Sequence, residues 1–285
     1  FLIANAQEQI MDQFASYQKS IGAKSIDLPK YEQLALATTP LTDKEDPASE
    51  ALVDSKVTLT PAEYGNVVTT TKLANVQTGG TSDRAAARLV GINAGRTQDK
   101  LAILSLDASS NELYPGAVAS EGALVAGDIM ASELLNRAYN KLARASVSGL
   151  IGGDYVAVMH DDVIHDLRET SAAGSWLDVN KYAMPGEVLK NELGMYRGFR
   201  IVRDNHSTLT ADAGAAAVDS YRSYFMGFNA FGKAVSQEPT LKLTGPFDKL
   251  ARFINMGWTG CFQYKIVESD ALYVGVSASS VGVNV

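Results

Sequence analysis

The sequence contains a single cysteine, Cys261, and only three histidines among its 285 residues. One cysteine excludes an intramolecular disulfide, and it excludes a zinc site built from several thiolates. The histidines, which are His160, His165 and His206, leave little material for a catalytic metal centre. A chain of this length buries roughly three quarters of its unfolded surface, so it needs no such crosslink to fold. We therefore expect no cofactor and no metal ion.

The sequence also lacks long apolar runs and an excess of basic residues. No run of about 18 apolar residues is present, so we expect no membrane span. The first five residues lack the basic start of a signal peptide. Lys and Arg number 25 against 32 Asp and Glu, which gives a net charge of −7. Duplex DNA attracts proteins that offer Lys and Arg to its phosphates, so this acidic chain is a poor candidate for tight DNA binding, and we expect no sequence-specific binding.

The motifs of common active sites are absent. A nucleophile elbow needs Gly-x-Ser-x-Gly, which the sequence does not contain. Residues 149–154 are rich in glycine, but they precede a predicted strand, whereas a phosphate loop follows a strand and opens a helix. Cys261 lies in an aromatic segment, where a cysteine is more often buried than catalytic. We therefore find no convincing nucleophile or phosphate site.

One group of residues suggests catalysis, namely His160, Asp161 and His165. His and Asp clusters bind divalent metals, so a metal-dependent hydrolase is one hypothesis for this chain. Residues five apart on a helix point in different directions, however, whereas residues three or four apart share a face. The alternative interpretation, which we favour, is that these residues begin a short helix.

Residues 1–19 have the spacing of an amphipathic helix. Ala6, Ile10, Phe14 and Tyr17 recur three or four residues apart, with polar side chains between them. Gly22 follows as an end signal. We therefore predict one helix over this segment.

Residues 24–72 have β character and contain a charged interruption. Residues 56–60 alternate polar and apolar side chains, and the β-branched residues 67–71 continue the pattern. Residues 38–47 carry two prolines and four charges, which predicts a loop. The whole segment is predicted to be one long hairpin with a charged tip. A two-stranded ribbon is marginal alone in water, so it must pack on its own domain or on a neighbouring subunit.

The remaining chain mixes helices and strands. The longest predicted helix covers residues 82–106 with Ser82 as its N-cap, and a second runs from Asp128 to about Ala145. A short helix follows Asp161, and residues 204–220 are small and polar, which predicts a mobile loop. Strands are predicted at residues 155–159, 199–202, 224–231, 253–267 and 272–276. Helices and strands do not alternate strictly, so the predicted fold class is α+β.

Three stretches carry a resemblance to a known family. They are residues 37–42 with 59–68, residues 155–163 with 166–168 and 176–182, and residues 198–202. Their order is similar to that in the major capsid proteins of tailed bacteriophages, especially the podovirus-type group, whose fold is shared with herpesviruses. In those relatives a proline often follows the histidine, whereas Asp161 follows His160 here.

The resemblance implies a division of the chain into the parts of that capsid fold. The parts would be an N-terminal arm at 1–23, an extended hairpin loop at 24–72, a peripheral domain with a spine helix at 73–120, an axial domain at 121–252, and peripheral return strands at 253–285. The hairpin would then lie over the spine helix of an adjacent subunit, and the N-terminal helix would also reach a neighbour. Residues 204–220 would lie near the axis of hexamers and pentamers.

The resemblance also implies a structural function without chemistry. The chain would assemble into an icosahedral shell that encloses double-stranded DNA, in the host bacterial cytoplasm, and would reside in the virion capsid. Scaffold, portal and decoration proteins are its candidate partners. The intersubunit contact residues that we expect are Ile10, Phe14, Tyr17, Tyr31, Asp43, Lys44, Glu45, Asp46, Glu50, Lys56 and Tyr64.

Two further possibilities follow from the same resemblance. The fold also builds bacterial nanocompartments, which enclose cargo enzymes, so a nanocompartment shell is an alternative function. Some relatives crosslink a hairpin lysine to a neighbour's asparagine, and Lys44 and Lys56 are the lysines that would qualify here. No partner for such a crosslink is identifiable in the sequence.

Overall fold

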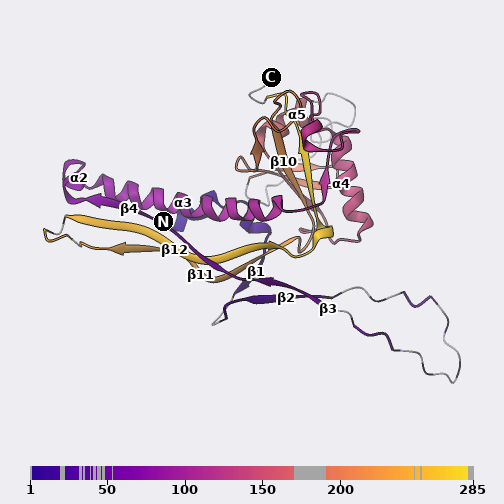
Figure 1. Cartoon of the computed structure of the whole chain (residues 1–285), viewed down its shortest axis with the longest axis horizontal. Helices are drawn as coiled ribbons and strands as arrows, with labels where there is room; N and C mark the ends of the chain where they lie inside the picture. The colour runs from indigo at the N-terminus through magenta and orange to yellow at the C-terminus, as the bar shows by residue number, and fades with distance from the viewer. Residues whose placement is uncertain are drawn as a thin grey trace.

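The molecule has an elongated part and a compact part, which Figure 1 shows meeting near the middle of the chain's longest axis. This computed structural model describes residues 2–19, 23–31, 54–169, 191–246, 248–250 and 252–281, and single positions between 34 and 52. In the elongated part a long helix lies along a long sheet, and a hairpin extends away from them. The described helices include none that is long and apolar enough to cross a membrane.

The elongated part is a two-layer arrangement of one helix on one sheet. The described strands of this sheet follow the order β1 (Ser16–Lys19), β11 (Phe231–Thr244), β12 (Phe253–Ile266) and β4 (Ala62–Thr71). The short helix α2 (Lys72–Gln77) connects β4 to the long helix α3 (Thr81–Asp107). Alternate residues of β12 face α3, among them Trp258, whose indole Nε1 donates a 2.9 Å hydrogen bond to Asn93 of α3. This hydrogen bond links the middle of α3 to the middle of β12.

The compact part is built on a second sheet. Its strand order is β5 (Glu112–Leu113), β13 (Leu272–Ser277), β10 (Ser220–Met226), β6 (Tyr155–Met159), β8 (Phe199–Arg203) and β7 (Glu192–Tyr196), and β9 (Leu209–Thr210) pairs with β10. Two helices, α4 (Ser132–Arg144) and α5 (Asp161–Glu169), belong to this part. All residues of β6 are buried, because Val156 and Val158 face the core shared with α3 while Tyr155, Ala157 and Met159 face a second core that includes α4 and α5. The central strand is therefore apolar on both faces.

The described strands of the hairpin pack on the body. It consists of β2 (Ile26–Tyr31) and β3 (Asp54–Leu59), which pair antiparallel from Ile26 with Leu59 to Tyr31 with Asp54. Leu28 and Leu59 are buried against Ala234 and Val267 of the body. The prediction of a hairpin is confirmed for these strands, but residues 62–71 form β4 of the long sheet instead of its return arm.

The prediction of one helix over residues 1–19 is wrong beyond Glu8. Helix α1 spans Leu2–Glu8, a 3-10 helix follows at Met11–Phe14, and β1 then pairs parallel with β11. The helix ends because the carboxylate of Asp99 in α3 accepts the backbone N–H groups of Ile10 and Met11 at 3.0 and 2.8 Å. A partner far along the chain therefore outweighs the local helical periodicity.

Chain segments also cross the predicted domain boundaries. Residues 231–244, expected in the axial domain, form β11 of the long sheet, because the chain leaves β10 at Gly227 and enters the other sheet at Phe231. Residues 272–277, expected with the peripheral strands, form β13 beside β10 in the compact part. The single strand predicted at 224–231 is thus the end of one strand and the start of another.

The predicted helices are present with different starts. Helix α3 matches the predicted 82–106 within one residue at each end, but its N-cap is Gly80 rather than Ser82. Helix α4 starts at Ser132, because Asp128 accepts the N–H of Val125 in a turn before it.

Residues 204–220, predicted as a loop, contain β9 and several buried polar side chains. Gly22 and residues 176–182 lie outside the described residues.

Gly95 of α3 tests how tightly α1 packs on the long helix. A Cβ atom there would lie 2.5 Å from the carbonyl oxygen of Asn5 and 2.9 Å from Cβ of Glu8. We expect Gly95→Val to lower the free energy of unfolding by about 2 kcal/mol in denaturant titrations, since overpacking a tight contact costs about 1–3 kcal/mol. Ala85→Val, at an exposed position of the same helix, is the control. Equal stability of the two variants would contradict this packing.

Candidate intersubunit surface

The outer part of the hairpin exposes apolar side chains that the body does not cover. Leu34, Leu36 and Leu52 are 58%, 87% and 61% exposed. They follow β2 and precede β3, so they belong to the segment that extends from the body in Figure 1. Exposed apolar residues on a projecting segment are typical of surfaces that bind another molecule.

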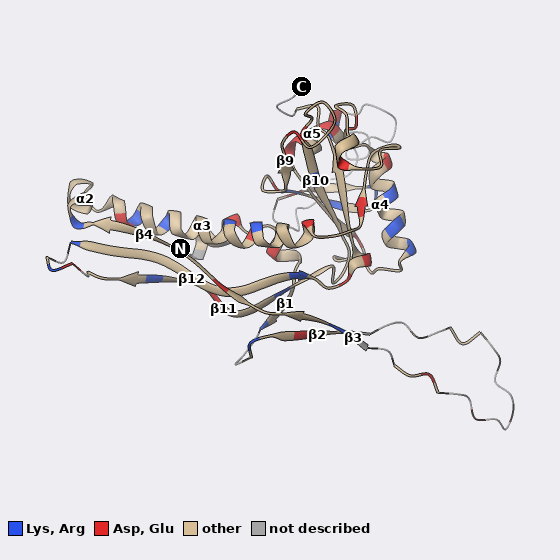
Figure 2. Cartoon of the chain, in the orientation of Figure 1, with Lys and Arg blue, Asp and Glu red and all other residues tan. Residues whose placement is uncertain are grey.

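The predicted acidic tip lies in this same segment. Asp43, Asp46 and Glu50 are exposed, whereas Lys44 and Glu45 lie outside the described residues. In Figure 2 the positions of Lys and Arg and those of Asp and Glu alternate along the described ribbon. The tip therefore presents carboxylates to any basic partner that approaches it.

Lys56 is held within its own hairpin. Its ammonium donates to Oδ2 of Asp27 at 2.8 Å, and the hydroxyl of Thr58 donates to Oδ1 of the same carboxylate at 2.6 Å. The Lys56 ammonium holds the pKa of Asp27 below its usual range. Tyr31 ends β2 opposite Asp54, and its side chain lies outside the described residues.

The other predicted contact residues lie on the body. Tyr17 is 49% exposed and donates its hydroxyl to Glu238 at 2.7 Å, and partial burial together with this bond raises the pKa of Tyr17 to about 12. Tyr64 of β4 packs its ring against Phe262, with 5.3 Å between ring centroids. Ile10 and Phe14 are only 6% and 3% exposed, because they are packed in the core under α3. The structure corrects the prediction for Ile10 and Phe14, which offer no surface to a neighbour.

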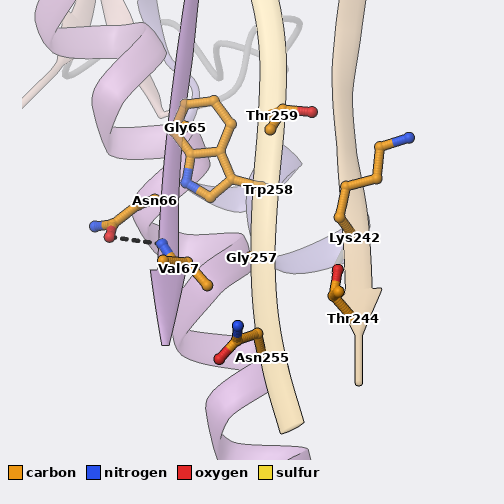
Figure 3. A pocket seen from close by; sticks show the side chains of 9 residues that line it. All are labelled: Gly65, Asn66, Val67, Lys242, Thr244, Asn255, Gly257, Trp258 and Thr259. Atoms are coloured by element: carbon orange, nitrogen blue, oxygen red, sulfur yellow. Dashed lines mark hydrogen bonds between the residues drawn. The ribbon is translucent and has the colours of Figure 1, made fainter. Parts of the chain in front are cut away.

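The long sheet carries a groove of about 430 Å³ over β4, β11 and β12 (Figure 3). It is lined by Gly65, Asn66, Val67, Lys242, Thr244, Asn255, Gly257, Trp258 and Thr259. Its floor depends on glycine, because a Cβ at Gly65 or Gly257 would lie 2.6 or 2.7 Å from a carbonyl oxygen of the adjacent strand. The hairpin strands pack on the same sheet at Ala234, which does not line the groove.

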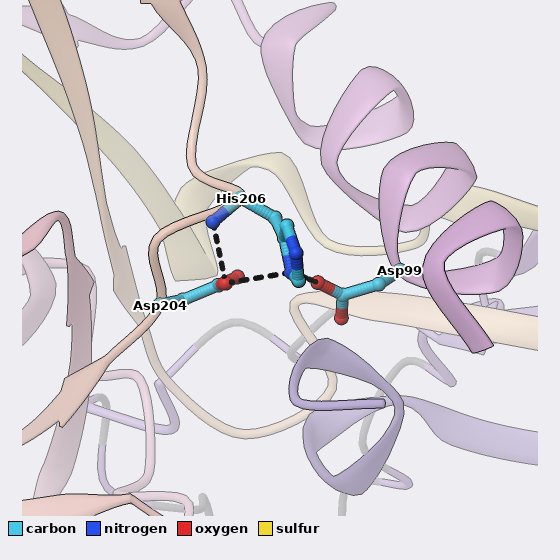
Figure 4. Close-up of side chains that lie close together, drawn as sticks. All are labelled: Asp99, Asp204 and His206. Carbon is cyan, nitrogen blue, oxygen red and sulfur yellow. Dashed lines mark hydrogen bonds and ion pairs between the residues drawn. The ribbon is translucent and has the colours of Figure 1, made fainter. Parts of the chain in front are cut away.

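A polar junction beneath α3 was not predicted from the sequence. Asp99 of α3 lies beside Asp204 and His206, which follow β8 (Figure 4). His206 Nδ1 is 3.4 Å from Oδ2 of Asp99 and 3.5 Å from Oδ1 of Asp204. Burial raises the pKa of Asp204, while the carboxylates of Asp204 and Asp99 raise the pKa of His206 to about 10. The residues are distant in sequence, so no local spacing could have revealed them.

A second part of this junction holds β11. Lys233 of β11 is 4% exposed, and its ammonium lies 2.7 Å from Asp12 and 3.1 Å from the amide oxygen of Gln98. Tyr264 donates its hydroxyl to the same Asp12 carboxylate at 2.8 Å. The N-terminal segment, α3 and two strands of the long sheet therefore meet at one buried ion pair.

The residues of the hydrolase hypothesis do not converge. Nδ1 of His160 accepts the N–H of Asp162 at 3.2 Å, which places it at the start of α5. His165 is more than half exposed on α5, beside Asp166 and Glu169. Among the described residues, the group that could hold a metal includes neither histidine. The helix-start interpretation of His160 and Asp161 is the one that fits this geometry.

Lys233→Met tests the buried ion pair. The variant keeps most of the apolar stem but leaves the Asp12 carboxylate without its cation, and removing one partner of a buried pair costs about 3–5 kcal/mol. We expect a loss near 3 kcal/mol in urea titrations, because Asp12 keeps some contact with water. Lys242→Met, at an exposed position of the same strand, should leave stability unchanged. A similar midpoint for both variants would refute the role of this pair.

Comparison with known proteins yields matches at the level of structure. No family model matches the sequence, and no curated protein matches it. A capsid chain of Ralstonia phage GP4 is 16% identical, with a TM-score of 0.78 over 93% of this chain and 87% of that one. A capsid chain of cyanophage Pam1 is 15% identical, with a TM-score of 0.69 over 94% and 89%.

A third similar structure is not named as a phage. A virus-like particle from Pyrococcus furiosus is 11% identical, with a TM-score of 0.57 over 96% of this chain and 94% of that one. Identities this low establish the architecture alone. The long helix, the long sheet, the projecting hairpin and the compact α/β part together form an α+β fold that is shared with the two phage capsid chains.

Proposed function

We propose that the chain is the shell protein of a tailed-phage capsid, which assembles into hexamers and pentamers and carries out no chemistry. The observation that carries the proposal is the hairpin, whose outer part exposes Leu34, Leu36 and Leu52, which the described part of the chain leaves largely uncovered. A monomer would leave this apolar surface in water at a cost of about 25 cal/mol per Å². A neighbouring subunit removes that cost.

The surface for the neighbour's hairpin would be the outer side of α3 and the adjoining strands. Leu89 and Leu104 of α3 are 62% and 51% exposed, on the side of the helix that faces away from the long sheet. Apolar residues on both the hairpin and the helix allow the two surfaces to cover each other. Tyr17, Tyr31, Asp43, Lys44, Glu45, Asp46, Glu50, Lys56 and Tyr64 remain the proposed polar and aromatic contacts.

The negative net charge of the chain is compatible with a shell that encloses DNA without binding it tightly. A net charge of −7 disfavours adhesion to phosphates. The shell would enclose double-stranded DNA without reading its sequence. It would be assembled in the host cytoplasm and would remain in the virion.

A phage shell is favoured over a nanocompartment by the strength of the structural likeness. The phage GP4 capsid chain gives a TM-score of 0.78, whereas the Pyrococcus furiosus particle gives 0.57. Both assemblies would use the same subunit contacts, so the hairpin argument holds for either. A nanocompartment would require a groove on the inner face that binds a peptide of a cargo protein.

The first test is the size of the purified protein in light scattering and negative-stain microscopy. We expect closed shells tens of nanometres wide, or rings of five and six subunits. A scaffold protein can be required for closure, so rings formed at high concentration or under crowding also support the proposal. A monodisperse monomer under all of these conditions would refute it.

The exposed leucines allow assembly to be separated from folding. We expect the double variant Leu36→Ser and Leu52→Ser to keep the unfolding midpoint, because both side chains are exposed in the single chain. Each leucine buried at an interface contributes about 1.5–3 kcal/mol, so the concentration needed for assembly should rise at least about tenfold. Thr38→Ser, an exposed change on the same hairpin, is the control. Unaltered assembly of the double variant would exclude the hairpin as the contact.

A further inference from the structure

The polar junction beneath α3 gathers three potential metal ligands from two distant segments. Asp99 belongs to α3, while Asp204 and His206 follow β8 (Figure 4). One ligand atom from each lies within 4.8 Å of the other two. Carboxylate oxygens and an imidazole nitrogen are common ligands of divalent transition metals.

The distances at the junction fit a shared ion better than direct hydrogen bonds. His206 Nδ1 lies 3.4 and 3.5 Å from the two carboxylates, whereas a charge-assisted hydrogen bond measures about 2.7–2.9 Å. Two ligands bound to tetrahedral zinc at about 2.0–2.1 Å are separated by roughly 3.3–3.4 Å. The observed spacing is therefore close to one edge of a zinc coordination tetrahedron.

Buried polar atoms at the junction lack hydrogen bonds, although His206 forms long ion pairs with both aspartates. Within the described residues, Oδ2 of Asp99, Oδ2 of Asp204 and Nδ1 of His206 are buried and make no hydrogen bond. The two aspartates are 1% and 0% exposed. Buried charges are normally paired or coordinate a metal, and one imidazolium supplies a single positive charge against two carboxylates. A divalent ion would neutralise both.

The other hydrogen bonds of the two aspartates hold them in place. Oδ1 of Asp99 accepts the N–H groups of Ile10 and Met11, which leaves Oδ2 for a ligand bond. Oδ1 of Asp204 accepts the backbone N–H of His206 at 2.9 Å. Outer contacts of this kind orient metal ligands and support affinity.

The junction also has an entry path. A cavity of about 170 Å³ reaches His206 and is lined by Glu8, Ile10, Asn191, Arg203, Asn205 and His206. It has room for water, which would complete the coordination of an ion held by three protein ligands. Calcium and magnesium prefer shells made of oxygen, so the imidazole favours zinc.

We propose that Asp99, Asp204 and His206 form a binding site for one zinc-class divalent ion, with water as the fourth ligand. Binding exchanges the proton on Nδ1 of His206 for the metal and releases that proton to solvent. The ion would join α3, the turn after α1 and the segment after β8, and so would lock the elongated part to the compact part. This inference concerns the single chain and does not depend on shell assembly.

The test is zinc binding by the full chain after dialysis against a chelator, measured by titration calorimetry. We expect one Zn²⁺ per chain and an increase in Tm on addition of zinc. His206→Gln and Asp204→Asn should each weaken zinc binding at least about tenfold, and should abolish the increase in Tm. His165→Gln changes an exposed histidine elsewhere and should behave as the wild type.

Cobalt provides a second measurement on the unaltered protein. Co²⁺ bound in the proposed site should give the intense visible absorption of tetrahedral coordination, and excess zinc should remove it. This result does not require either variant to fold. The proposal is overturned if the wild type binds less than one equivalent of zinc, if His206→Gln binds zinc as tightly as the wild type, or if the cobalt spectrum is octahedral.

Discussion

The buried carboxylate of Asp99 is the constraint on which the rest of the chain depends. It ends α1 by accepting two N–H groups, and this turn directs the chain into β1 beside β11. The neighbouring ion pair of Lys233 and Asp12 joins β11 to the same place. An unpaired buried charge costs several kcal/mol, so these contacts hold their partners in place. The N-terminal segment, α3 and the long sheet are consequently joined by buried polar contacts.

These contacts leave other surfaces of the described chain open. Helix α3 covers one face of the long sheet, and the described hairpin strands pack against the sheet around Ala234 and Val267. The groove along β4 and β12 and the described leucines of the hairpin remain exposed to solvent. In the proposed shell these open surfaces would be available to neighbouring subunits.

The sequence predicted those elements whose pattern is local. Helix α3, the apolar stripe of α4, the buried strand β6 and the helix after Asp161 all follow from periodicity within a window of residues. Sheet membership did not follow, because β4, β11 and β13 are assigned by pairing with strands far along the chain. The prediction for Ile10 and Phe14 failed because of another distant partner. Their spacing predicted one helix with an exposed contact face, but Asp99 of α3 ends the helix before Ile10, and both side chains are buried. His206 was overlooked because its partner Asp99 is distant in sequence.

The residues that stabilise the fold differ from those that are available for contacts with other molecules. The strong interactions, such as the Lys233 pair and the apolar cores on both faces of β6, lie inside the chain. The hairpin instead offers exposed leucines and solvent-exposed carboxylates, whose individual ion pairs contribute less than about 1 kcal/mol. In the proposed shell, contacts this weak would let a wrongly placed subunit dissociate, whereas their repetition around a closed ring would make correct assembly stable. The subunit therefore keeps its shape through a few strong buried contacts, and it would hold its neighbours through many weak ones.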